Sequence, residues 1–160
     1  MISITVISVG NLKEKFLTDA ANEYIKRLSA FCKLSIIEVN EINPPKNASK
    51  AQIEKALNGE EKMIFKQIPD RAFVAALCIE GKQVSSNEFS DIIKKYALEG
   101  INNIVFIIGS SNGLSQKVKD RADFKMSFSK MTFPHQLFRV LLLEQIYRAF
   151  TILNDMTYHK

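Results

Sequence analysis

The sequence has little cysteine, and it lacks both a long apolar run and a signal peptide. Its two cysteines, Cys32 and Cys78, lie among apolar neighbours, which favours reduced, packed thiols over a disulfide framework. Two isolated thiols do not form a metal site, so we expect no metal. No stretch is apolar enough to cross a bilayer, and the start MISITVISVG lacks the basic residues and cleavage site of a signal peptide. We therefore expect a soluble, cytoplasmic protein that does not contact membranes.

Glycine is also scarce where the common nucleotide-binding folds need it. A dinucleotide-binding fold needs clustered glycines after its first strand, whereas the stretch SVGNLKEK has only Gly10. A Walker-type phosphate loop needs a lysine and a serine or threonine directly after glycine, whereas Gly113 is followed by Leu114 and Ser115. Both nucleotide-binding folds are therefore disfavoured.

The residue patterns predict strands that alternate with helices. The 160 residues, 46% of them hydrophobic, are enough for one core, so we expect a single domain over residues 1–160. The predicted strands cover residues 2–9, 34–39, 72–79, 104–108 and 125–128. The predicted helices cover residues 15–31, 49–66, 86–100 and 115–122, with Ser49 and Ser86 as N-caps, and Pro134 opens a last helix. This alternation indicates an α/β fold, a mostly parallel sheet with helices on both faces and ligands beyond the carboxyl ends of its strands.

Three segments that follow predicted strands are candidates for the walls of one pocket. They are Leu77–Gly81, Gly109–Gly113 and Phe128–Phe133, and together they offer apolar side chains and exposed backbone groups. Glycines in the second segment have two explanations: close approach of a ligand to the backbone, or turn formation alone. Local sequence leaves both explanations open.

The C-terminal stretch SFSKMTFPHQLFRVLLLEQIYRAFTILNDMTYHK is more specific. Together with IIGSSNG and the N-terminal ITVISVGNLKEKF, it resembles the SPOUT-class methyltransferases that modify pseudouridine at N3 in bacterial large-subunit ribosomal RNA. The resemblance covers essentially the whole chain. It implies a homodimer, a C-terminal trefoil knot that binds S-adenosylmethionine in a bent shape, and a preference for 23S rRNA in assembled ribosomes over naked RNA. The formal net charge of +5 agrees with an RNA partner.

The resemblance also assigns residues to the site. It implies a cofactor site formed by Leu77, Gly109, Phe128, Ser129, Lys130, Met131, Thr132 and Phe133. A branched side chain at Gly109 would then occupy the space of the ligand. The family usually has a second glycine at Ser110, and serine costs roughly 1–2 kcal/mol there if that residue must be left-handed.

The reaction needs a proton acceptor as well as proximity, because the N3 nitrogen must lose its imide proton when it attacks the sulfonium methyl. The resemblance points to Tyr158, His159 and Lys160 as catalytic residues, and Arg139 completes the predicted catalytic set because it could reach the RNA or the partner's cofactor in a dimer. His159 can accept a proton near neutral pH or bind RNA phosphate, although a terminal tripeptide in an arbitrary protein is usually disordered. His135 follows the helix-opening Pro134, and on spacing alone it is a structural histidine, outside the catalytic set.

The last predicted helix is apolar on more than one side. Leu142, Ile146, Ala149, Phe150 and Leu153 form one stripe, and Leu137, Leu141 and Ile152 lie away from it. A helix of this kind is buried on more than one side, so we expect a second subunit to cover it. In such a dimer, Arg139 could reach the RNA or the partner's cofactor. Tyr147 and Phe150 are expected to pack, and Glu144 with Arg148 to form a structural i, i+4 pair.

Two other functions stay open at this point. One is a non-catalytic ribosome-binding homologue, which only Ser110 favours. The other is an unrelated α/β enzyme that uses the glycine segment to hold phosphate.

Overall fold

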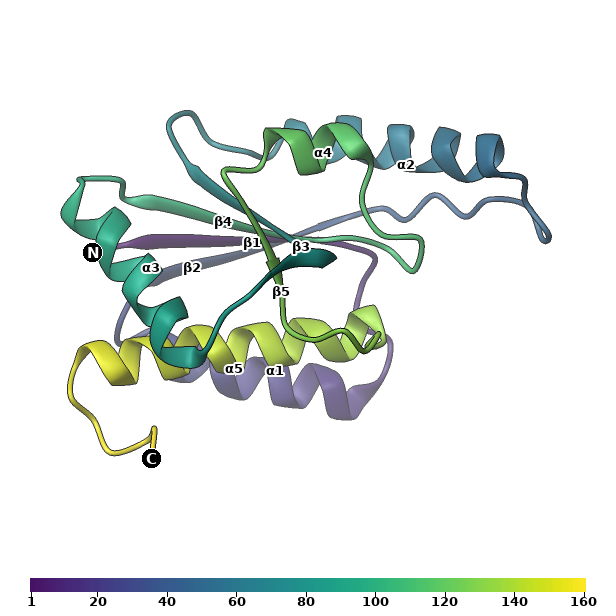
Figure 1. The fold of residues 1–160 in the computed structure, drawn as a ribbon. Helices are drawn as coiled ribbons and strands as arrows, with labels where there is room; N and C mark the ends of the chain where they lie inside the picture. The colour runs from purple at the N-terminus through teal and green to yellow at the C-terminus, as the bar shows by residue number, and fades with distance from the viewer.

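The computed structural model describes residues 1–160, and its centre is one fully parallel five-stranded sheet (Figure 1). The strand order is β2-β1-β4-β3-β5. The strands are β1 (Ser3–Val9), β2 (Lys33–Val39), β3 (Phe73–Gln83), β4 (Asn103–Ile108) and β5 (Phe124–Ser127). The helices are α1 (Lys15–Leu28), α2 (Lys50–Phe65), α3 (Ser86–Leu98), α4 (Gln116–Arg121) and α5 (His135–Leu153).

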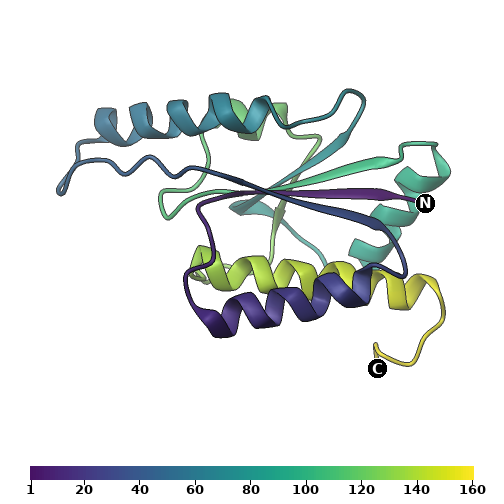
Figure 2. The ribbon, with the colours of Figure 1, turned by 180° about the vertical axis from the view of Figure 1, so that it is seen from behind.

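Helices cover both faces of the sheet, as the alternating sequence pattern predicts. Helices α1, α3 and α5 lie on one face, and α2 and α4 lie on the other (Figures 1 and 2). Side chains alternate between the two faces along each strand: Ile4 and Val6 of β1 belong to the first apolar cluster, while Ile7 and Val9 belong to the second. This confirms the predicted α/β architecture, and the trefoil knot stays a prediction.

Serine caps set the starts of three helices. Ser49 and Ser85 form full capping boxes with Gln52 and Glu88, and the hydroxyl of Ser115 accepts a hydrogen bond from the Val118 N–H. The predicted cap at Ser86 is therefore wrong by one residue. The reciprocal bonds of Ser85 and Glu88 satisfy the backbone donors at that helix start.

Strand β3 is longer than its sequence pattern predicts. It continues past Ile79 to Gln83, because its last part pairs again with β5 after a shift in register between Leu77 and Lys82. Gly81 permits this close approach, since a Cβ there would lie 2.6 Å from the backbone carbon of Met126.

Helix α5 packs one side on the sheet and leaves apolar side chains on another. Leu142, Ile146 and Ala149 are fully buried, whereas Leu137 is 36% exposed and Leu141 is half-buried. A single chain therefore does not cover this helix completely, and the homodimer stays a prediction. None of the helices has the length and apolar character that a membrane span requires.

Candidate functional site

A cavity of about 640 Å³ opens at the carboxyl ends of β3, β4 and β5. All three segments predicted to wall one pocket contribute to it, through Leu77–Glu80, Gly109–Gly113 and Phe128–Phe133. Among the predicted cofactor residues, Leu77, Gly109, Phe128, Ser129, Met131, Thr132 and Phe133 line it, and Lys130 does not. Parallel strands bring these loops together because their carboxyl ends share one edge of the sheet. The volume lies within the range of small-ligand pockets.

The wall contributed by Gly109–Gly113, called the glycine loop below, is a tight turn. The Gly113 N–H donates to the Ser110 carbonyl at 2.9 Å, and Gly113 has a φ of +84°. At Gly109, an added Cβ would lie 2.3 Å from the Gly113 carbonyl oxygen. We expected a side chain at residue 109 to fill the space of the ligand. This reason is wrong, because the loop's own backbone already occupies the position of the Cβ. Ser110 does not have a positive φ, so the backbone strain expected for a left-handed serine is absent.

Aromatic rings form the opposite wall. The ring of Phe138, from the first turns of α5, lies 4.7 Å from the Phe128 ring and 6.3 Å from the Phe133 ring, centroid to centroid. The connecting segment is held by its own bonds: the Ser127 hydroxyl donates to the Ser129 carbonyl at 2.9 Å, and the Met131 N–H donates to the Ser129 hydroxyl at 3.0 Å. Aromatic faces of this kind suit a cationic ligand group.

Arg139 is buried away from this cavity. It is only 3% exposed, and its guanidinium donates to the Ser8 hydroxyl at 2.9 and 3.1 Å and to the Gly10 carbonyl at 2.9 Å. The same group lies 3.5 Å from a carboxylate oxygen of Glu38. In this chain Arg139 therefore ties the start of α5 to the ends of β1 and β2, and it does not face solvent where RNA would bind.

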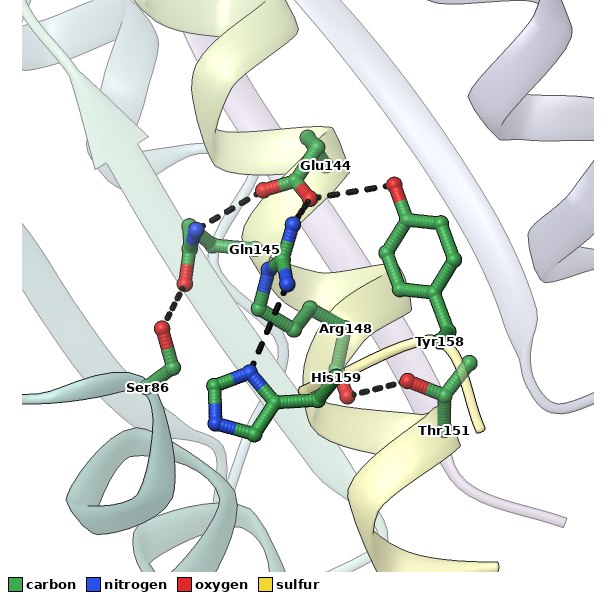
Figure 3. A network of polar contacts seen from close by, with 7 residues as sticks. All are labelled: Ser86, Glu144, Gln145, Arg148, Thr151, Tyr158 and His159. Atoms are coloured by element: carbon green, nitrogen blue, oxygen red, sulfur yellow. Dashed lines mark hydrogen bonds and ion pairs between the residues drawn. The ribbon is translucent and has the colours of Figure 1, made fainter. Parts of the chain in front are cut away.

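The C-terminal tail folds back onto α5. Asp155 has a φ of 50°, a left-handed conformation that aspartate tolerates in turns. The Tyr158 hydroxyl then donates to Glu144 at 3.2 Å, and its ring lies 4.9 Å from that of Tyr147. Figure 3 shows Tyr158 and His159 on either side of Arg148, whose Nη1 lies 3.4 Å from His159 Nδ1.

Glu144 organises this tail contact. It forms the predicted ion pair with Arg148 and also accepts from the Gln145 side chain at 2.7 Å, while Ser86 donates to Gln145 at 2.7 Å (Figure 3). Burial, with the neighbouring Tyr24 and Glu144, raises the pKa of Tyr158 to about 12. Tyr158 is therefore a protonated hydrogen-bond donor at neutral pH.

The tail and the large cavity lie at different ends of α5. The cavity is lined by His135 and Phe138 near the start of the helix, and no tail residue contributes to its walls. A smaller cavity of about 330 Å³ reaches Glu144 and Gln145 and shares Met126, Phe128 and Phe133 with the large one. One subunit therefore does not bring its own tail to its own large cavity.

Comparison with known proteins decides the family. A family model described as "Predicted SPOUT methyltransferase" matches residues 2–159. The chain belongs to the SPOUT methyltransferase family. This confirms the family that the C-terminal motifs predict.

Curated relatives of this SPOUT methyltransferase match it along nearly its whole length. A protein of Clostridium botulinum (strain Hall) named Ribosomal RNA large subunit methyltransferase H is 55% identical over 99% of this chain and 100% of its own. Another, of Clostridium perfringens (strain SM101), is named Ribosomal RNA large subunit methyltransferase H 1 and is 52% identical with the same coverage. The structure of a probable methylase family protein from Haemophilus influenzae Rd KW20 matches with a TM-score of 0.57 at 12% identity, over 99% of this chain and 70% of that one, and so supports the fold alone.

Sequence reasoning missed several residues of the cavity. His135, set aside as structural, lines the cavity, and so do Lys119 and Phe138. Lys119 forms an ion pair with Glu80 at the cavity edge and lowers the pKa of that carboxyl. Pro134 places His135 in the first turn of α5, directly after the predicted cavity segment Phe128–Phe133. This position is the signal in the sequence that could have identified His135 as a cavity residue.

Proposed function

We propose that this chain is an S-adenosylmethionine-dependent methyltransferase that methylates N3 of a pseudouridine in 23S rRNA within assembled ribosomes. The observation that carries the proposal is the 55% identity, over essentially the whole chain, to a relative named Ribosomal RNA large subunit methyltransferase H. The cavity formed by all three predicted segments supports it. We further propose that the protein acts as a single-domain homodimer in the cytoplasm, without a metal.

The cavity suits S-adenosylmethionine, which would supply the sulfonium methyl. Its 640 Å³ volume, its apolar walls and its aromatic rings fit a mid-sized ligand that carries a positive charge. We assign binding to Leu77, Gly109 and the segment Phe128–Phe133. Within that segment Lys130, whose side chain lies outside the cavity walls, would contact the ligand least.

The tail residues are assigned to the RNA. Tyr158 holds its proton at neutral pH, because burial raises its pKa to about 12, so it would donate a hydrogen bond and not act as the base. His159 is then the proton acceptor for N3, and Lys160 binds phosphate. Since the tail lies at the other end of α5 from the cavity of its own chain, we place it over the cavity of the partner in the dimer.

Arg139 receives a different role from the catalytic one predicted for it from the sequence. Its contacts with Ser8, Gly10 and Glu38 hold the helix turn that carries His135 and Phe138 into the cavity wall. We therefore propose that Arg139 positions this wall and does not touch the reacting atoms.

The alternative of a non-catalytic ribosome-binding homologue loses its only support. That alternative depended on strain at Ser110, and Ser110 adopts no left-handed conformation.

Three measurements test the proposal. Calorimetry should show that the protein binds S-adenosylmethionine, and labelled cofactor should transfer its methyl group to ribosomes that lack the modification. Mass spectrometry of the labelled 23S rRNA should place the methyl group on a pseudouridine. Binding without transfer would favour the non-catalytic homologue, and failure to bind the cofactor would refute the proposed function.

A further inference from the structure

Two adjacent glutamates near the end of α2 are buried. Glu60 is 2% exposed and Glu61 is 6% exposed, whereas Glu54, Lys55 and Lys62 of the same helix lie in solvent. Burying a carboxylate is unfavourable unless it is hydrogen-bonded or paired. The partners of these two side chains therefore explain why they lie inside the protein.

Glu60 contacts a serine within the glycine loop, and Glu61 contacts a serine just after it. Glu60 accepts a hydrogen bond from the Ser110 hydroxyl at 3.1 Å and another from the Ile42 N–H at 3.3 Å. Glu61 accepts from the hydroxyl of Ser115 at 2.7 Å. Ser110 is the second residue of the loop, and Ser115 lies two residues after its last glycine. The two contacts therefore bracket the segment that lines the cavity.

The loop's internal bonds do not fix it to the rest of the protein. The bond between Gly113 and the Ser110 carbonyl closes the turn on itself. The contacts with Glu60 and Glu61, in contrast, join residues 50 and 54 positions apart in the chain. Helix α2 contributes no residue to the cavity wall, but it contacts the segment next to that wall through these two bonds, through an ion pair between Glu61 and Lys117 at 3.8 Å, and through the apolar cluster that Ile64 shares with Leu114.

We propose that Glu60 and Glu61 are positioning residues for the cofactor, which hold the glycine loop at Ser110 and the chain just after it at Ser115, and so keep the loop in the shape that lines the cavity. The proposal rests on the proposed function, since it assumes that the cavity binds S-adenosylmethionine. The two residues touch neither cofactor nor RNA. They act through the hydroxyls of Ser110 and Ser115.

The Ser110 hydroxyl also affects the pKa of Glu60. Burial is the main cause that raises its pKa, and Glu41 adds to it, while the bonds from Ile42 and Ser110 lower it. The Ser110 hydroxyl therefore offsets part of the cost of burying this carboxyl group.

Hydrogen exchange of the ligand-free protein tests the anchoring. Ser110→Ala removes only the hydroxyl, and Glu60→Ala removes its acceptor, so each should speed exchange of the loop amides at least tenfold. The double variant should exchange no faster than the faster single variant, because both changes remove one contact. Glu61→Ala should act in the same way at Gly113 and Leu114. The exposed Glu54→Ala is the matched control on the same helix and should leave the loop unchanged.

Calorimetry with S-adenosylmethionine tests the positioning role. Ser110→Ala and Glu60→Ala should weaken binding three- to tenfold, and Glu60→Gln, which keeps an acceptor oxygen, should remain within about twofold of the original protein. Loop exchange or affinity equal to that of the original protein in Ser110→Ala would overturn the proposal, as would additive effects in the double variant. If the unaltered protein does not bind the cofactor, the proposed function fails first. The exchange data then still decide whether the glutamates anchor the loop.

Discussion

Replacing Gly109 with alanine is the sharpest test of how the glycine loop is built. The new Cβ would lie 2.3 Å from the Gly113 carbonyl oxygen and 2.5 Å from its carbonyl carbon, where ordinary contacts begin at 3.4 Å. The loop must therefore open by about 1 Å, a shift that its closing bond between Gly113 and Ser110 opposes.

The cost follows from these two effects. Overpacking costs roughly 1–3 kcal/mol, and loss of the turn's hydrogen bond adds roughly 0.5–1.5 kcal/mol. For a chain of this length each kcal/mol lowers the melting temperature by roughly 2–4 °C. We therefore expect Gly109→Ala to melt several degrees lower. Its affinity for S-adenosylmethionine should fall at least tenfold, because the displaced loop is a cavity wall.

Gly100→Ala is the matched control, assayed by thermal denaturation and calorimetry in parallel. Gly100 has a φ of +78° and open space around it, so alanine there introduces backbone strain of roughly 1–2 kcal/mol without a clash and outside the cavity. It should lose stability and keep its affinity. A Gly109→Ala protein with unchanged melting temperature and unchanged affinity would refute the account of the loop given above.

Four further changes have expected outcomes. Deleting residues 158–160 should abolish methyl transfer to ribosomes yet leave S-adenosylmethionine affinity within about threefold, or ~0.7 kcal/mol, by calorimetry; near-normal transfer would remove the tail from the active site. Leu141→Glu should shift the protein from dimer towards monomer in ultracentrifugation, because a charge on the partly exposed face of α5 opposes a second apolar surface; an unaffected dimer would place the interface elsewhere. Folding raises the pKa of Tyr158 to about 12, so its contribution to stability is present below its unfolded pKa and is lost as pH rises through 12. The Tyr158→Phe variant should therefore lose less stability than the original protein in denaturation experiments between pH 10 and 12. Parallel stability profiles of the two proteins over this pH range would contradict the raised pKa. Arg139→Met should weaken cofactor binding, whereas Gly100→Ala should keep its affinity, and an Arg139→Met protein with unchanged affinity would reduce Arg139 to a purely structural role.

Much of the fold follows from the sequence, because the relevant interactions are local. Alternating apolar residues place Ile4, Val6, Ile7 and Val9 on two faces of one strand, and serine caps mark helix starts within one residue. The motifs around MTFPHQ and LLLEQIYRAF predict the family, and the family model confirms it. The three cavity segments are also predictable, since the carboxyl ends of parallel strands meet at one edge.

Other features depend on residues that are distant in the chain. The extension of β3 to Gln83 requires β5 beside it, which no local pattern of β3 contains. Glu60 lies four residues from both Ala56 and Ile64, so the helical spacing indicates that it lies on the buried face of α2. No local pattern indicates the hydrogen bond that offsets the burial of Glu60, because its partner Ser110 is 50 residues away.

The sequence by itself determined the elements, the family and the segments that meet at the cavity, because spacing and motif are properties of neighbouring residues. Only the tertiary structure decided what individual side chains do there. It showed that Gly109 is needed for the approach of Gly113, and that Arg139 lies inside the chain against Ser8 and Glu38. It also placed Tyr158 on Glu144, away from the cavity of its own chain. These roles depend on atoms brought together by folding, and burial and hydrogen bonding act over distance in space and not along the sequence.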